Sequence, residues 1–150
     1  MSARPVSVKS ELELRLVVPG MASVPVNADL RYEACSPYAV SVSFRTGEAG
    51  VVEWTFARQL LTDGVSQPAG EGDVSVWPSR SSGRPVVCLA LSSPSGRALF
   101  EVPLPRLVQF LTNTYAAVPT GAESDYFDLD AELAHLLGGE SDLLGGESDR

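Results

Sequence analysis

The chain has 150 residues, of which 44% are hydrophobic and 20% charged, a balance typical of one globular domain with its own core. No apolar run approaches the roughly 20 residues of a membrane-spanning helix, and the N-terminus lacks the apolar segment of a signal peptide. We therefore expect a cytoplasmic protein without direct insertion into a membrane.

The net charge of −8 is concentrated at the C-terminal end. Residues 1–119 carry ten acidic and ten basic side chains, whereas residues 120–150 carry nine acidic side chains and a single basic one, Arg150. This distribution predicts a balanced domain followed by an acidic segment, which either keeps the protein in solution or contacts a partner.

Alternating apolar and polar residues predict strands in the first half of the chain. From Val6 to Val18 every even position is apolar except Ser10, which is the pattern of a strand with one buried face. Three further strands are predicted in the same way, at residues 24–32, 40–45 and 51–55. Residues 46–50 are predicted to form a hairpin loop.

The periodicity then changes to that of a helix. Phe56, Leu60 and Leu61 share one helical face, and Gly64 stands where a glycine commonly ends a helix. We therefore predict a short helix over residues 56–63.

The middle of the chain again predicts strands, at residues 73–78, 86–92 and 98–102. A turn at residues 68–72 and a polar loop at residues 79–85 are expected to separate the first two of them from their neighbours. Residues 86–92 are nearly all apolar, which predicts a central strand covered on both faces, with Cys88 as a small buried hydrophobe.

Two helices are predicted in the last third of the chain. The first begins near Pro105, ends at Val118-Pro119, and carries an apolar stripe made of Leu107, Val108, Phe110, Leu111 and Tyr115. The second covers residues 128–137 and has acidic residues in its first turn, where the helix dipole favours them. The predicted fold is thus an α+β domain with an antiparallel or mixed sheet of about seven strands and three helices.

A perfect tandem repeat ends the chain. Residues 136–142 and 143–149 both read Leu-Leu-Gly-Gly-Glu-Ser-Asp, and the paired glycines oppose a regular coiled coil. We interpret residues 138–150 as a flexible acidic tail that follows a domain at residues 6–137. The leucine pairs are candidate docking points.

The sequence shows no catalytic or metal-binding constellation. His135 is the only histidine, and no nucleophile-elbow motif accompanies it. Cys35 and Cys88 form no C-x-x-C pair, and of the two only Cys35 is a candidate exposed thiol. The acidic cluster at residues 128–132 lacks the glycine and the final acid of a calcium loop. We expect a protein that is not an enzyme and uses no cofactor.

Single-stranded nucleic acid is the alternative ligand. Trp54 and Trp77 lie on predicted strands, and Arg80 and Arg84 follow the second of these, so that stacking and charge are both present. A neutral body with an acidic segment opposes phosphate binding, and tryptophans at such positions more often pack in a core or an interface. We therefore assign Trp77, Arg80 and Arg84 as candidate partner-binding residues.

Several segments are specific enough to indicate a family. They read Leu-Arg-Tyr-Glu at 30–33, Pro-Tyr-Ala-Val at 37–40, Val-Glu-Trp-Thr-Phe-Ala-Arg at 52–58, Trp-Pro-Ser-Arg at 77–80 and Phe-Asp-Leu-Asp at 127–130. Across residues 10–137 the chain resembles the SsgA-like proteins of sporulating actinomycetes. The segment at 77–80 and Leu-Ser-Ser-Pro at 91–94 make it most similar to the SsgB branch. Ser36, where the family commonly has an acid, and the tandem repeat depart from the family pattern.

The resemblance implies a fold similar to the Whirly and guide-RNA-binding proteins and assembly into a homotrimer. It also implies a non-enzymatic regulator of septation during sporulation, localised at the division septum. The expected partners are FtsZ, which the family recruits to division sites, and an SsgA-type paralogue.

Overall fold

The computed structural model describes residues 6–45 and 50–126 of the chain. Four strands come first: β1 (Ser7–Leu16), β2 (Val24–Glu33), β3 (Ala39–Arg45) and β4 (Val51–Ala57). Helix α1 (Arg58–Ser66) leads to β5 (Ala69–Glu71), β6 (Val74–Ser81), β7 (Arg84–Ser93) and β8 (Gly96–Pro103). Helices α2 (Leu104–Ala117) and α3 (Glu123–Tyr126) follow.

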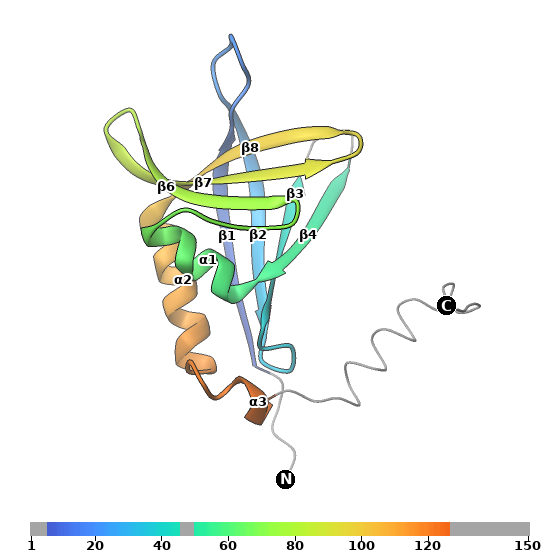
Figure 1. The fold of residues 1–150 in the computed structure, drawn as a ribbon, viewed down its shortest axis with the longest axis vertical. Helices are drawn as coiled ribbons and strands as arrows, with labels where there is room; N and C mark the ends of the chain where they lie inside the picture. The colour runs from blue at the N-terminus through green and yellow to red at the C-terminus, as the bar shows by residue number, and fades with distance from the viewer. Residues whose placement is uncertain (1–5, 46–49, 127–150) are drawn as a thin grey trace, which may run out of the picture.

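All eight of these strands belong to one sheet, in the order β4-β3-β2-β1-β8-β7-β6-β5. Every neighbouring pair is antiparallel, so the sheet is antiparallel and not mixed over the described residues. β1 and β8 share only two register positions, Arg15 with Glu101 and Leu16 with Phe100. The sheet therefore bends at this short joint, and its halves β1–β4 and β5–β8 cross each other (Figure 1).

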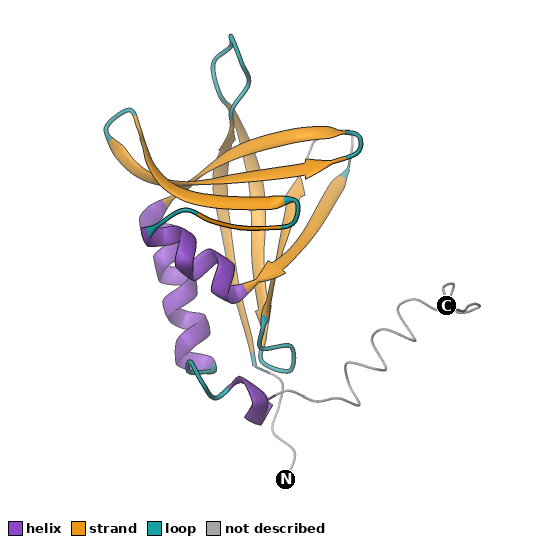
Figure 2. Ribbon diagram, in the orientation of Figure 1, coloured by secondary structure: helices purple, strands orange, loops and turns teal. Residues whose placement is uncertain are grey.

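The core lies between the two halves. The even positions of β1 face it, as the alternation predicts, and Leu14 is almost completely buried. Helices α1 and α2 close one side of the space between the halves (Figure 2) and contribute apolar side chains to it. The helical members of the core are Leu60, Leu61, Leu107, Phe110 and Leu111, and Val118 joins them directly after α2. Val108 was predicted to join this stripe and is 39% exposed instead.

The predicted helix at residues 56–63 is displaced along the chain. Phe56 and Ala57 continue β4, and α1 extends from Arg58 to Ser66 with Gly64 inside it. Gly64 does not end the helix: a Cβ atom at this position would overlap Val76 of β6. The glycine thus permits α1 to lie directly on the sheet.

The predicted turn and loop around β6 are also corrected. Residues 69–71 form β5 within the predicted turn, which brings the strand number from the predicted seven to eight in the described part of the chain. The predicted polar loop at residues 79–85 is the end of a long β6–β7 hairpin. Ser82 and Gly83 both have positive φ angles, of 52° and 78°, as a two-residue hairpin turn requires. This turn lets the polar ends of β6 and β7 pair as far as Ser81 and Arg84.

The remaining predictions near the C-terminus have different outcomes. α2 confirms the predicted helix near Pro105, whereas α3 lies between the two predicted helices, where no helix is predicted. The predicted helix at residues 128–137, His135 and the acidic tail lie outside the described residues. Among the helices of the described residues, none is long and apolar enough to cross a membrane.

Candidate interaction surface

A buried arginine joins the three helices to the sheet. Arg58 begins α1, and its side chain is only 2% exposed. Its guanidinium carbon lies 3.9 Å from the ring centroid of Tyr115 and 5.0 Å from that of Tyr32, which are distances of cation–π contact. Nη1 donates hydrogen bonds to the backbone oxygens of Thr114 (3.1 Å) and Val118 (2.9 Å).

The same guanidinium binds a carboxylate. Arg58 Nη2 lies 2.9 Å from Glu123 Oε2, and the backbone N–H of Gly121 donates to Glu123 Oε1. The pKa of Glu123 is below its ordinary value, first because of a hydrogen bond from its own backbone N–H and also because of Arg58. We call Arg58, Tyr32, Tyr115 and Glu123 the Arg58 clamp. Because its donors already bind the end of α2 and α3, this arginine is a structural residue.

The outer face of β1–β4 is charged, and its charges pair across the strands. Arg31 lies 2.9 Å from Glu53 on β4, and Arg45 contacts both carboxylate oxygens of Asp29 at 2.7 and 2.9 Å. The pKa of Arg45 is raised, first by its hydrogen bond to Asp29 and then by the charge of that carboxylate. Glu11 lies 3.6 Å from Arg45.

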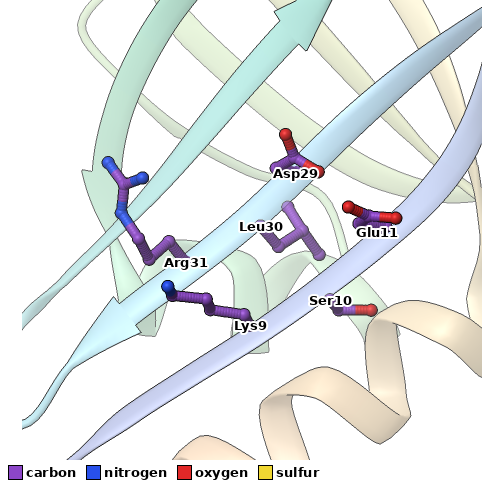
Figure 3. Close-up of a pocket in the computed structure, with 6 residues that line it drawn as sticks. All are labelled: Lys9, Ser10, Glu11, Asp29, Leu30 and Arg31. Atoms are coloured by element: carbon purple, nitrogen blue, oxygen red, sulfur yellow. The ribbon is translucent and has the colours of Figure 1, made fainter.

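An open depression of about 300 Å³ lies on this outer face (Figure 3). Lys9 and Arg31 lie beside each other at one end of it, and Glu11 and Asp29 lie beside each other at the other end. Positive and negative side chains therefore share the depression, which gives no continuous positive groove for a phosphate backbone.

The outer face of β6–β8 carries fewer charges and more apolar side chains by contrast. Trp77 of β6 pairs with Cys88 of β7, which pairs with Glu101 of β8, so strand alternation places these three side chains on one face. Cys88 is 6% exposed, which confirms that it is a buried small side chain, although it lies on the outer face. Burial raises the pKa of the Cys88 thiol, a hydrogen bond with Ser79 opposes this shift, and the charge of Glu101 adds to it.

A groove of about 480 Å³ follows this face toward the joint of the sheet. We call it the Trp77 groove. Its apolar and aromatic lining includes Val17, Pro19, Trp77, Ala90 and Leu99, with Arg97 and Asp73 as charged members. Half-buried aromatic and apolar side chains with an arginine form the usual composition of a protein–protein contact centre.

The structure separates the three predicted partner-binding residues. Trp77 lines the groove, and Arg84 shares its face of the sheet by strand alternation. Arg80 has the opposite parity, and its Nη1 donates to the backbone oxygen of Gly83 (2.8 Å), within the β6–β7 turn.

Sequence reasoning missed Arg97 and Leu99, which line the groove from β8. The alternation of residues 97–102 could have placed both side chains on the outer face, because odd positions of this strand face outward and even positions inward. Over the described residues there is no group of three or more side chains that could hold a metal ion.

Comparison with known proteins identifies relatives over most of the chain. The family model described as "Streptomyces sporulation and cell division protein, SsgA" matches residues 26–123. The sporulation-specific cell division protein SsgB of Frankia casuarinae is 63% identical, over 93% of this chain and 97% of that protein. SsgB of Streptomyces coelicolor is 56% identical, over 87% of this chain and 96% of that protein.

Solved structures also match this chain over most of its length. An SsgA-like sporulation-specific cell division protein from Thermobifida fusca superposes with a TM-score of 0.80 and 47% identity, over 90% of this chain and 98% of that one. A structure from work on SsgB mutations in Streptomyces coelicolor superposes with a TM-score of 0.81 and 54% identity, over 85% and 100% of the two chains. The curled antiparallel sheet with few helices is therefore shared with these proteins.

Proposed function

Because the chain belongs to the SsgA family of sporulation and cell division proteins, we propose that it is a non-enzymatic regulator of sporulation-specific cell division. Its relatives are named as cell division proteins and not as enzymes. In this proposal the protein localises to sporulation septum sites and recruits or positions FtsZ there through direct protein contacts.

The observation that carries the proposal is the Trp77 groove. Trp77 and Leu99 give the groove an aromatic and apolar lining, and Arg97 adds a cation. Contacts of this kind supply most of the free energy of a protein–protein complex, since a few central aromatic and arginine side chains dominate binding.

The outer face of β1–β4 has a secondary role in this proposal. Arg31 is already paired with Glu53, and Arg45 with Asp29. A partner that replaced these exposed ion pairs by its own would therefore gain little binding free energy. Such a face contributes to the polar periphery of an interface and to the rate of association more than to affinity.

Oligomerisation is the second part of the proposal. A homotrimer would present three Trp77 grooves to a polymer of FtsZ subunits. Each further contact is then intramolecular, and overall affinity can rise by about 10² to 10⁴ without a new kind of contact. An SsgA-type paralogue is the proposed second partner at the septum.

The test is an FtsZ co-sedimentation assay with the full chain and the variants Trp77→Ala and Leu99→Ser. A hot-spot contribution of about 2 kcal/mol corresponds to roughly 30-fold weaker binding for Trp77→Ala. Glu53→Gln on the opposite outer face is the control, and its affinity should change less than about twofold. Wild-type affinity in both groove variants would exclude the groove as the FtsZ contact.

Binding of single-stranded nucleic acid is the second candidate function, because Trp77 and Arg84 share one face of the sheet. Base stacking on Trp77 with a nearby cation is the arrangement that such binding uses. Fluorescence anisotropy with labelled single-stranded DNA at low salt tests it. No binding by the wild-type chain would remove this candidate, whereas binding lost in Trp77→Ala would support it.

A further inference from the structure

An open apolar depression lies between β4 and the β7–β8 turn. Its volume is about 330 Å³. We call it the mouth, and define it by Leu16, Phe44, Val52, Trp54, Phe100 and Arg97. The rings of Phe44 and Phe100 stack at a centroid distance of 4.5 Å, and the ring of Trp54 stacks on Phe56 at 6.5 Å.

The mouth leaves apolar side chains open to solvent. Val52 is 43% exposed and its neighbour Val51 is 65% exposed, although both lie on a strand. β4 is a terminal strand of the sheet, so no further strand covers it among the described residues. Exposed apolar side chains gathered at a sheet edge commonly mark a contact surface.

Among the described residues that line the mouth, Arg97 is the only charged one. Arg97 is exposed, and its guanidinium has no hydrogen bond or ion pair within the part of the chain that the structure describes. The described lining of the mouth contains no carboxylate. The mouth is therefore suited to an apolar segment that carries negative charge beside its apolar residues.

The chain's own C-terminal sequence has this chemistry. Residues 127–150 contain seven acidic side chains against Arg150, and each copy of the tandem repeat places a leucine pair shortly before a glutamate and an aspartate. We propose that the second copy, residues 143–149, docks in the mouth of its own chain. Leu143 and Leu144 occupy the cavity, and the following carboxylates lie against Arg97.

The volume of the mouth agrees with this occupant. A cavity of about 150 Å³ holds a benzene molecule. The mouth, at about 330 Å³, is more than twice as large and accommodates two leucine side chains.

The length of the C-terminal segment favours the second copy over the first. α3 and the β7–β8 turn lie toward opposite ends of the molecule (Figure 1). A domain of this size is roughly 35 Å across. With the predicted helix over residues 128–137, which rises about 1.5 Å per residue, Leu136 lies at most about 19 Å along the chain from Tyr126, too short to cross the domain. The same helix followed by extended chain places Leu143 at most about 40 Å from Tyr126, which is enough to cross it.

Covalent connection makes a weak contact sufficient. A flexible tether holds the segment at an effective concentration in the millimolar range, so an intrinsic affinity of the same order gives substantial occupancy. Because the contact is intramolecular, its occupancy does not depend on protein concentration. This inference does not depend on FtsZ binding, and the following experiment contains no FtsZ.

The experiment compares ¹H–¹⁵N spectra of the full chain and of Leu143→Ser/Leu144→Ser. The indole N–H of Trp54 in the mouth should shift, and the backbone N–H of Leu107 in α2, which lines neither the mouth nor the Trp77 groove, should not, which also shows that the domain remains folded. The matched control Leu136→Ser/Leu137→Ser changes the first leucine pair in the same way and should leave Trp54 unchanged. Arg97→Glu should move the Trp54 signal in the same direction as Leu143→Ser/Leu144→Ser.

Three outcomes would overturn the proposal. One is an identical Trp54 signal in the wild-type chain and in Leu143→Ser/Leu144→Ser. Another is a Trp54 shift caused only by Leu136→Ser/Leu137→Ser, which would assign the contact to the first copy. The third is a Trp54 signal that depends on protein concentration in the wild-type chain, because the occupant would then be a second molecule.

Discussion

Two regions of the molecule use arginine in opposite ways. On the outer face of β1–β4, Arg31 and Arg45 form ion pairs in water, with side chains about half exposed. At the junction of the helices, Arg58 is enclosed between two tyrosine rings and donates to Glu123 and two backbone oxygens. The outer pairs are exchangeable surface contacts, whereas the Arg58 clamp holds α1, α2 and α3 together.

The burial of Arg58 shows that a residue shared with the family can serve the fold and not binding. Arg58 ends one of the segments that resemble the SsgA-like proteins, and Tyr32 lies in another. Both side chains are buried in the clamp, so the presence of Arg58 and Tyr32 in these segments reports the fold and not a binding surface. Binding residues are therefore better sought on the outer face of β6–β8.

Loss of the Arg58 guanidinium should have the largest effect on stability. Arg58→Met removes donors from two backbone oxygens and leaves Glu123 without its cation. Breaking a buried pair costs about 3–5 kcal/mol, and we expect about 3 kcal/mol because the Glu123 carboxylate can still reach water. Urea unfolding measures the change in free energy.

Arg15→Met is the matched control for this variant. Arg15 is exposed on β1, and its loss should change the free energy of unfolding by less than about 0.5 kcal/mol. Equal losses in the two variants would contradict the contrast between a buried clamp and an exposed charged face.

Substitution of Gly64, where α1 packs against β6, should have the next largest effect on stability. Gly64→Ala would normally favour a helix, but the added Cβ overlaps the completely buried side chain of Val76. Overpacking of this kind costs about 1–3 kcal/mol, and we expect about 2 kcal/mol by urea unfolding.

Gly70→Ala provides the control for this substitution. A Cβ at Gly70 meets only ordinary van der Waals contacts with β6, and its backbone has no positive φ. The control should therefore be close to neutral. A neutral Gly64→Ala would show that α1 can move away from β6 without loss.

These residues show how far the sequence predicts the structure. The alternation in β1 and the apolar run in β7 are local patterns, and the strands that they predict are confirmed. The predicted cover on both faces of β7 is not, because Ala90 on its outer face lines the open Trp77 groove. Gly64 was interpreted as a helix end because its reason lies in Val76, a residue distant along the chain. The pairing of Arg58 with Glu123 spans 65 residues and has no local signal.

The candidate surface was predictable only in part. The sequence indicates Trp77 as a contact residue, and the structure places Trp77 in a groove. The groove itself depends on which strands are neighbours, because Val17 and Arg97 reach it through the β1–β8 joint and the β7–β8 hairpin. Single-sequence patterns predict the strands but do not predict this order.

Acid should weaken the clamp through Glu123, with a smaller effect than loss of Arg58. The pKa of Glu123 is below its ordinary value of 4.5, so its contribution to stability is complete above that value and is lost as pH falls through the lower pKa of the folded state. Glu123→Gln lacks this contribution. The stability difference between wild type and Glu123→Gln should thus be constant near neutral pH and decrease as the pH is lowered below 4.5, as measured by urea unfolding across pH. A difference that grows in acid would contradict the depressed pKa.

The smallest effect is expected for the ion pair between Arg31 and Glu53. Their side chains are 43% and 51% exposed, so water and salt weaken the attraction, and a coupling free energy of about 0.2–1 kcal/mol is expected. A double-mutant cycle with Arg31→Met and Glu53→Gln measures this coupling without the other effects of each substitution. The coupling should decrease further in about 0.5 M NaCl, because dissolved ions screen exposed charges. A coupling above about 2 kcal/mol that does not depend on salt would mean that this face is as rigidly organised as the Arg58 clamp, and the outer charges would then have to be treated as part of the fold.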